Sequence, residues 1–199
     1  MAFTVTTWTD YLCPWAYLGR RHSQWIRNAG VDVMIRGYEL HPDVPPEGRP
    51  IRPGGSYDRL LDRLQAESRA NGVDFNKPSR TPNTRAALEL LELVHHHQPD
   101  RALAYDDALA AATWIDGRPI DQADVLRDLA TEAGVDDDLV RLLDLGRGSE
   151  LLEAGRAEAI EFEVSATPSW RIGELTIAGV HEDAQFQRWA GRLIERNSS

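Results

Sequence analysis

The sequence predicts an α/β fold interrupted by an all-helical insertion. Residue runs typical of β-strands occur only near the two ends of the 199-residue chain, whereas the middle carries apolar residues at helical spacing. The elements before the middle part are ordered strand–helix–strand, and those after it helix–strand–strand–helix. Both parts of one sheet therefore flank the helical segment, which makes that segment an insertion and not an appended domain.

The N-terminal part reads as strand, helix and strand. Residues 3–8, FTVTTW, alternate β-branched and aromatic side chains and predict a buried strand. Pro14 suits the first position of a helix because its missing N–H needs no partner there, so Cys13 is predicted as the N-cap. That helix is expected to continue to the NAG segment at 28–30, and residues 31–40 predict a second strand.

A proline- and glycine-rich loop is predicted at 41–55, and its unusual length suggests a functional role. Ser56 is a plausible cap for the helix that follows. Apolar stripes then predict a series of helices, which begin near residues 56, 83, 101, 122 and 137.

The C-terminal part predicts a helix at 149–164, strands at 169–172 and 175–178, and a final helix at 183–195. Without the helical block, the element order is βαβ followed by αββα, which is the order of the thioredoxin fold. We therefore predict a thioredoxin-like domain formed by residues 1–55 and 146–199, with a helical insertion at 56–145.

Charge and composition exclude several classes of partner. With 22 basic and 32 acidic residues, the formal net charge is −10, which disfavours binding to nucleic acid or to an anionic membrane surface. No apolar run is long enough to span a bilayer, and the N-terminus lacks the pattern of a secretory signal. A single cysteine fits a reducing compartment. We expect a cytoplasmic protein.

Cys13 is the candidate catalytic residue. Backbone N–H groups and the helix dipole stabilise a thiolate at a helix N-terminus, so the thiol pKa is predicted to fall below its ordinary value. The aromatic side chains of Trp8, Trp15 and Tyr17 are expected to wall the sulfur on one side. The alternative is a buried and inert cysteine.

A second feature points to the same site. Thr167-Pro168 precedes the first strand of the C-terminal part, where a proline needs an edge, a bulge or a cis bond. A thioredoxin fold carries a cis-proline opposite its thiol at this place.

The chain resembles the DsbA-like thioredoxin superfamily, and within it most closely the FrnE-type dithiol–disulfide oxidoreductases. More distant likenesses are the 2-hydroxychromene-2-carboxylate isomerases and the kappa-class glutathione transferases. The resemblance covers nearly the whole chain and rests on these segments: DYLCPWAYLGRR, YELHPDVPPEG, TPNTRAALEL, IDQADVLRDLATEAGVD, ATPSW and GVHEDAQF.

The resemblance implies roles for individual residues. Cys13 matches the attacking cysteine of the family and Pro168 its cis-proline, while the backbone of Thr167 matches the segment that pairs with a peptide or glutathione. Pro14 and Trp15 belong to the same substrate-binding segment. His41 lies in the loop that resembles the substrate-side wall, with a merely water-facing role as its alternative.

Ala16 departs from the pattern, because the oxidoreductases of the family carry a second cysteine there. Without that cysteine, only an external thiol can resolve a mixed disulfide on Cys13. Three chemistries stay open: thiol–disulfide exchange resolved by an outside thiol, a glutathione-dependent isomerase or transferase, and a binding module that has lost catalysis. We expect no tightly bound cofactor, glutathione or a protein disulfide as reaction partner, and leave a homodimer open.

Other polar residues are predicted to be structural. Three consecutive histidines at 95–97 point in different directions on a helix and are read as a solvated helix end, so no metal site is predicted. His22 is expected on the helix surface. Arg20 and Arg21 are interpreted as surface residues, with attraction of a glutathione carboxylate as the alternative.

Overall fold

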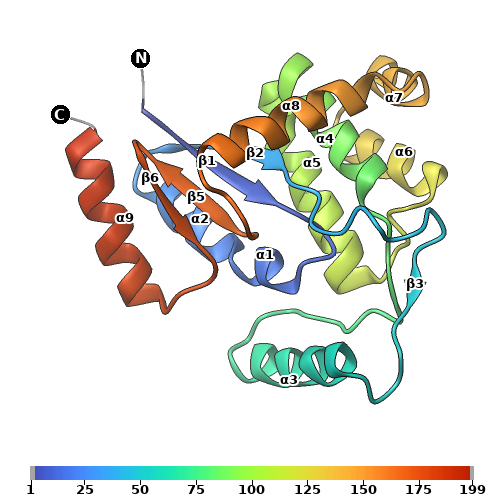
Figure 1. Ribbon diagram of the computed structural model, residues 1–199, viewed down its shortest axis with the longest axis horizontal. Helices are drawn as coiled ribbons and strands as arrows, with labels where there is room; N and C mark the ends of the chain where they lie inside the picture. Colours follow the sequence, from blue (N-terminus) through green and yellow to red (C-terminus); the bar gives the residue numbers. More distant parts are fainter. Residues whose placement is uncertain (1–2, 198–199) are drawn as a thin grey trace.

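The computed structural model describes residues 3–197 and contains a four-stranded mixed sheet with the strand order β2-β1-β5-β6 (Figure 1). Strand β1 (Thr4–Thr9) runs parallel to β2 (Asp32–Gly37) and antiparallel to β5 (Ser169–Ile172). Strand β6 (Leu175–Ala178) pairs with β5 in an antiparallel hairpin. This topology confirms the thioredoxin-like α/β fold.

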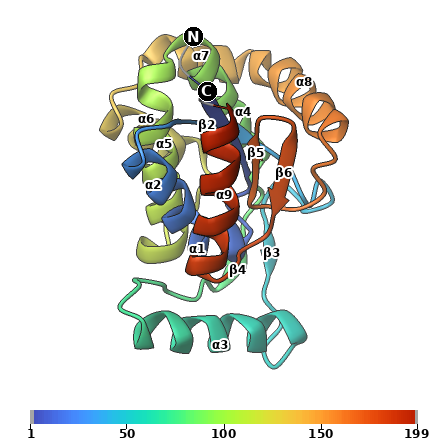
Figure 2. The same cartoon turned by 90° about the vertical axis from the view of Figure 1, so that its left-hand side faces the viewer.

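Helices cover both faces of the sheet. Helices α1 (Pro14–Leu18), α2 (Arg20–Asn28) and α9 (Asp183–Asn197) lie on one side, and α8 (Arg147–Glu161) lies on the other (Figure 2). Residues of β1 alternate between these faces: Val5 packs into the cluster with α2 and α9, whereas Trp8 packs towards α8. The alternation is the two-residue period of a strand buried on both sides.

The helical part of the chain has its own core. It contains α4 (Arg85–His97), α5 (Pro99–Ala111), a π-helical turn (Ala112–Asp116), α6 (Ala123–Glu132) and α7 (Asp137–Asp144). Leucines and alanines of these helices form the largest apolar cluster, which reaches the sheet through Ile35 of β2. Helix α8 follows the predicted insertion, whereas α4 lies within it. Because α8 packs along α4, the insertion and the C-terminal part are packed together.

Helix α3 (Ser56–Ala70) stands apart from the other helices of the chain in both views (Figures 1 and 2). A short antiparallel ribbon of β3 (Arg49–Pro50) and β4 (Arg80–Thr81) joins the two segments that lead to and from it. Its buried leucines pack with Phe75, Trp114 and the side chains of α1. This helix therefore lies over α1, the helix that follows Cys13.

Several elements differ from the sequence-based expectation. The helix expected from 14 to about 28 is two helices, because the chain turns at Gly19. Gly55, and not Ser56, is the N-cap of α3. The loop predicted at 41–55 contains β3, whose two residues are too few to leave a strand pattern in the sequence. Within residues 3–197, no helix is long and apolar enough to cross a bilayer.

Candidate active site around Cys13

Cys13 is the N-cap residue of α1, and Pro14 occupies the first helical position as predicted. The chain reaches this point through a tight turn in which the Cys13 N–H donates to the carbonyl oxygen of Asp10 over 3.0 Å. The N–H of Ala16 then donates to the Cys13 carbonyl over 3.1 Å. The end of β1 thus places the sulfur at the start of a helix, directly beyond the sheet.

The segment that precedes β5 meets Cys13 from the other end of the sequence. The Thr167–Pro168 peptide bond is cis, and the thiol of Cys13 donates a hydrogen bond to the carbonyl oxygen of Thr167, with 3.3 Å between Sγ and O. Because β5 pairs with β1, the two features that the sequence places 154 residues apart lie side by side.

The prediction of a lowered thiol pKa is wrong. Cys13 is 6% exposed, and its burial raises the thiol pKa above the ordinary value of 9.0. The side chain of Thr167 and the amides of Ala16 and Trp15 lower the pKa, whereas the nearby Asp10 carboxylate raises it. Loss of solvent outweighs the helix N-terminus, so the sulfur is protonated near neutral pH.

Asp10 is a fully buried carboxyl group three residues before Cys13. Its oxygens accept hydrogen bonds from the Leu12 N–H, the Leu40 N–H and the Thr84 hydroxyl at 3.3, 2.8 and 2.7 Å. Burial raises the Asp10 pKa to about 6, against the lowering effect of these hydrogen bonds. Asp10 therefore ties the Cys13 turn to the loop after β2 and to the start of α4.

A cleft of about 500 Å³ opens between the Cys13 turn, the loop after β2 and the start of α3. Cys13, Pro14 and His41 line it together, and the His41 side chain is largely exposed. Tyr57 closes one side and donates a hydrogen bond from its hydroxyl to the Leu12 carbonyl over 3.2 Å. The structure thus brings His41 to the same cleft as the thiol.

The three aromatic side chains expected to wall the sulfur do not line the cleft at Cys13. Trp15 is 40% exposed and lines a separate groove of about 460 Å³ between α1, α3 and the segment before α9. Tyr17 stacks with Trp114, and Trp8 packs edge-on against Phe162. Because consecutive residues of a helix point about 100° apart, Pro14 and Trp15 face different grooves.

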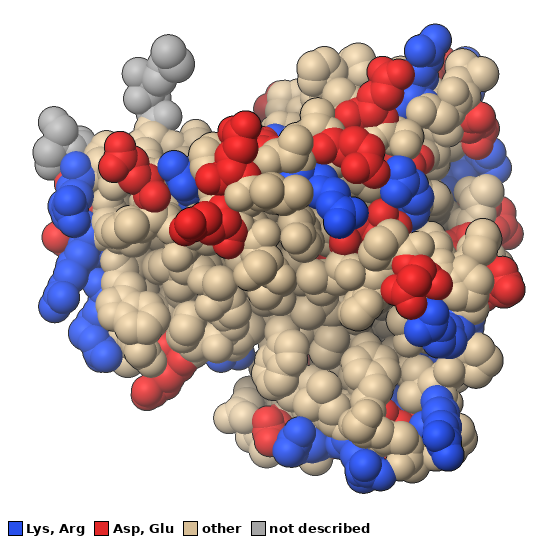
Figure 3. Space-filling view, in the orientation of Figure 1, with Lys and Arg blue, Asp and Glu red and all other residues tan. Residues whose placement is uncertain are grey.

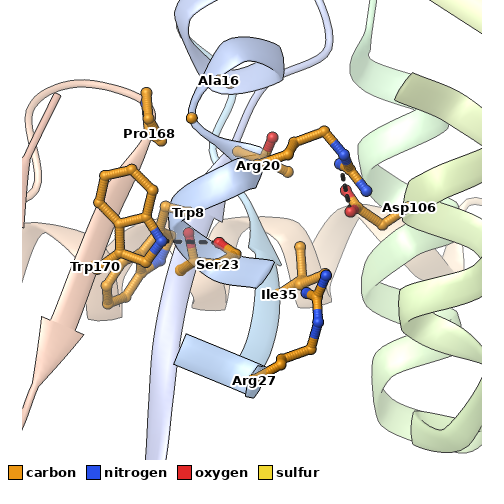
Figure 4. Close-up of a pocket in the computed structure, with 12 residues that line it drawn as sticks. Trp8, Ala16, Arg20, Ser23, Arg27, Ile35, Asp106, Pro168 and Trp170 are labelled. Atoms are coloured by element: carbon orange, nitrogen blue, oxygen red, sulfur yellow. Dashed lines mark hydrogen bonds and ion pairs between the residues drawn. The ribbon is translucent and has the colours of Figure 1, made fainter. Parts of the chain in front are cut away.

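Ala16 lies beside a small cavity of about 20 Å³ under the cis-proline (Figure 4). Pro168, Trp8 and Trp170 contribute to its lining, and the Trp170 indole donates to the Ser23 hydroxyl over 2.8 Å. Within residues 3–197, the buried Trp8 Nε1 has no hydrogen-bond partner. Ala16, which stands where the resemblance implies a second cysteine, therefore borders a small cavity with both polar and apolar lining residues.

The two arginines after the site are engaged within the fold. Arg20 binds Asp106, with 2.6 Å between Nη1 and Oδ2, and also contacts Asp107. Arg21 binds Asp183 over 2.6 Å. The Arg20 guanidinium is thus shared between two carboxylates, whereas the Arg21–Asp183 pair is exposed.

The prediction that His22 lies on the surface is wrong. This residue is 1% exposed, its ring stacks on Phe186 with centroids 4.0 Å apart, and its Nε2 lies 3.1 Å from the His181 carbonyl oxygen. Burial and the positive charge of Arg21 lower the His22 pKa to about 4, so the ring is neutral and serves packing.

The three histidines at the end of α4 belong to a half-buried to exposed helix terminus. No group of three or more His, Cys, Asp or Glu side chains between residues 3 and 197 has an arrangement that would hold a metal ion.

These features together define a class of protein. It has the thioredoxin fold, one cysteine at the start of its first helix, and a cis-proline beside that cysteine. The chain belongs to the DsbA-like thioredoxin domain family, which residues 4–188 match.

Solved structures share this fold. A protein from Streptomyces coelicolor, SCO1869, described as a probable DsbA oxidoreductase, is 23% identical with a TM-score of 0.79, over 96% of this chain and 89% of that one. A 2-hydroxychromene-2-carboxylate isomerase is 20% identical with a TM-score of 0.75, over 98% and 97%. The cytosolic disulfide reductase DsbM from Pseudomonas aeruginosa, solved with GSH, is 15% identical with a TM-score of 0.67, over 98% and 96%.

A sequence relative is the uncharacterized protein YwbO of Bacillus subtilis, which is 22% identical over 191 residues. The aligned region covers 94% of this chain and 96% of the relative. The likeness therefore extends over the whole fold.

Sequence reasoning missed three residues of this site. Asp10 ends a buried strand just before the cysteine turn, and an acidic residue at that edge of a sheet is a signal for a site. Tyr57 has the spacing of an apolar-stripe residue in its helix, which conceals a role at the cleft. Arg52 lies in the loop before α3 and lines the Cys13 cleft, which only the folded chain reveals.

Proposed function

We propose that this protein carries out thiol–disulfide exchange through Cys13, with an external thiol such as glutathione as the resolving partner. The observation that carries the proposal is the position of the sulfur, at the start of α1, 3.3 Å from the Thr167 carbonyl oxygen and on the wall of an open cleft. Membership in the DsbA-like family supports the same chemistry.

The exchange proceeds in two steps. The Cys13 thiolate attacks one sulfur of a substrate disulfide, the new S–S bond joins Cys13 to that half, and the other half leaves as a thiolate. An external thiolate then attacks the mixed disulfide and releases Cys13. Because Ala16 carries no sulfur, this second step depends on the outside thiol.

The raised thiol pKa defines the kinetic character of this exchange. Few Cys13 side chains are ionised at neutral pH, but a thiolate of high pKa is a strong nucleophile and a poor leaving group. We therefore expect slow capture of the substrate and a long-lived mixed disulfide. A reducing compartment such as the cytoplasm supplies the small thiols needed to resolve it.

Intact-mass measurement after incubation with oxidised glutathione tests this function. We expect one glutathione adduct on the wild-type protein, its removal by reduced glutathione, and no adduct on Cys13→Ser. An unmodified wild-type protein at pH 8 would refute the exchange reaction. In that case the fold acts as a binding module or supports another chemistry.

A second candidate function is a glutathione-dependent isomerase, favoured by the protonated state of Cys13. A neutral thiol can donate a hydrogen bond to the thiolate of bound glutathione, and a 2-hydroxychromene-2-carboxylate isomerase shares the fold. This function requires bound reduced glutathione and survives in Cys13→Ser, because a hydroxyl is also a donor. Turnover of 2-hydroxychromene-2-carboxylate by both proteins would favour it over exchange.

A further inference from the structure

The cleft at Cys13 has a charge opposite to that of the whole protein. The chain carries a net charge of −10, yet this cleft is lined by three basic residues, His41, Arg49 and Arg52, and by one acidic residue, Asp58. Asp58 is neutralised by Lys77, with 2.6 Å between Oδ1 and Nζ, and its side chain is only 16% exposed. The charge that the cleft offers to a bound molecule is therefore positive.

Two of the basic side chains are already engaged. Arg49 binds the Asp43 carboxylate over 3.0 Å and its carbonyl oxygen over 3.1 Å. His41 faces the same carboxylate, with Nδ1 3.8 Å from Oδ1. Asp43 thus offsets the charge on this side of the cleft.

Arg52 is different. Its side chain is exposed, and it forms no ion pair with any residue of the 3–197 range. Its backbone is held, since the Arg52 carbonyl accepts a hydrogen bond from the Gly55 N–H over 3.0 Å. An arginine stays protonated at every physiological pH and binds carboxylates through two parallel hydrogen bonds. Arg52 therefore presents an unused anion-binding group at the cleft.

The remainder of the cleft is mostly apolar, with Ser56 and Thr81 as its polar residues. Its apolar lining consists of Leu12, Pro14, Leu40, Val44, Pro50, Ile51 and Tyr57. Figure 3 shows mostly uncharged side chains in the hollow above α3. The volume of about 500 Å³ lies within the range of small-molecule sites, which combine apolar walls with a few polar groups that orient the ligand.

We propose that the disulfide half transferred to Cys13 has an apolar body with an anionic group, and that Arg52 binds this anion while the apolar walls hold the body. This inference rests on the proposed exchange function and specifies its substrate class. The Cys13 thiolate forms the new S–S bond with that half, and the other half leaves as its thiolate. Glutathione, which lacks an apolar body, then fits the role of the resolving thiol.

Two aromatic disulfides that differ in charge test the proposal: 5,5′-dithiobis(2-nitrobenzoate), which carries a carboxylate on each ring, and 4,4′-dithiodipyridine, which is smaller and uncharged at neutral pH. The release of the coloured thiol gives the second-order rate constant of Cys13 with each. Cys13→Ser supplies the background. The variants are Arg52→Gln and, as a matched control, Arg63→Gln, an exposed arginine on α3 outside the cleft.

We expect Arg52→Gln to slow the reaction with the dicarboxylate about fivefold, as for an exposed ion pair, and to leave the dipyridine rate within about twofold. The loss should shrink at high salt, because screening weakens an exposed pair. Arg63→Gln should change neither rate beyond the small effect of net charge.

An equal loss with both disulfides, or an equal loss in Arg63→Gln, would overturn the proposal. If wild-type Cys13 reacts readily with both disulfides and Arg52→Gln has no effect, the exchange function stands and only the substrate class is wrong. If wild-type Cys13 reacts with neither disulfide, the exchange function itself fails. The two failures are thus distinct.

Discussion

Pro168 packs directly against Gly19, so closely that a Cβ atom on Gly19 would lie 2.6 Å from the proline Cγ. The same Cβ would also lie 3.1 Å from the Trp15 carbonyl oxygen and from the Trp170 ring. The break between α1 and α2 therefore occurs where a glycine admits the proline loop. The proline loop thus lies against the end of α1, and its Thr167 carbonyl accepts the hydrogen bond from Cys13.

Gly19→Ala should displace the proline loop. A methyl group at 2.6 Å from Pro168 cannot be accommodated without movement, so we expect the free energy of unfolding to fall by about 1–3 kcal/mol. Cys13 should react faster with iodoacetamide, because displacement of Thr167 uncovers the sulfur. Urea unfolding and alkylation kinetics measure the two effects.

Gly191→Ala is the matched control, since its Cβ would lie 3.8 Å from Trp25, an ordinary contact. Within α9, alanine also favours the helix, so this variant should be unchanged or slightly more stable. Equal behaviour of the two variants would contradict the tight contact at Gly19.

Asp10→Asn should change both stability and thiol acidity. The Asp10 carboxyl has a pKa of about 6 in the folded protein against 3.8 as its ordinary value, so between these pH values the folded state holds a proton that the unfolded state has lost. Asp10 therefore lowers the stability of the wild type by about 3 kcal/mol as the pH rises through this window. The difference in unfolding free energy between Asp10→Asn and the wild type should rise by that amount from pH 3 to pH 7.

The same substitution removes a negative charge that raises the Cys13 pKa. The alkylation profile of Asp10→Asn should therefore shift to lower pH relative to the wild type. Asp100→Asn, at an exposed position of α5, controls for the loss of one charge. A profile that shifts equally in both variants would show that net charge, and not the buried position of Asp10, sets the thiol pKa.

His22 should act in the opposite direction over nearly the same pH range. Its pKa is about 4 in the folded protein and 6.5 ordinarily, so the unfolded state binds the extra proton and stability falls as the pH drops through this window. We expect a loss of about 3 kcal/mol, absent in His22→Phe, measured by urea unfolding at several pH values. His96→Gln, at the exposed end of α4, should retain the wild-type dependence. A persistent dependence in His22→Phe would assign it to another group.

The local features of the site were predictable, and the long-range ones were not. Pro14 identified the helix start and Cys13 as its cap because both preferences act within one turn. The thiol pKa depends instead on burial, to which the distant Thr167 segment contributes, and no local pattern reports that loss of solvent. The prediction for His22 was wrong for a similar reason, because its partners Phe186 and His181 are distant from it in the sequence. The position of Arg52 at the cleft could not be predicted, because it depends on how the loop before α3 folds against the cysteine turn.

Ala16→Cys tests whether the site keeps the geometry of a dithiol centre. Residues three apart on a helix have Cβ atoms about 5–6 Å apart, and a small adjustment of the N-cap brings two sulfurs within bonding distance. The cavity of about 20 Å³ beside Ala16 gives room for the added sulfur.

We expect the Ala16→Cys variant to form an intramolecular disulfide with an oxidant, seen as the loss of two thiols and of two mass units. It should also resolve a glutathione adduct on Cys13 without an outside thiol. Ala154→Cys, exposed on α8, should form no such bond and should keep its adducts. If Ala16→Cys keeps two free thiols after oxidation, the helix start holds position 16 too far from Cys13 for a disulfide. The backbone at the site would then differ from that of a dithiol centre, as the sequence does.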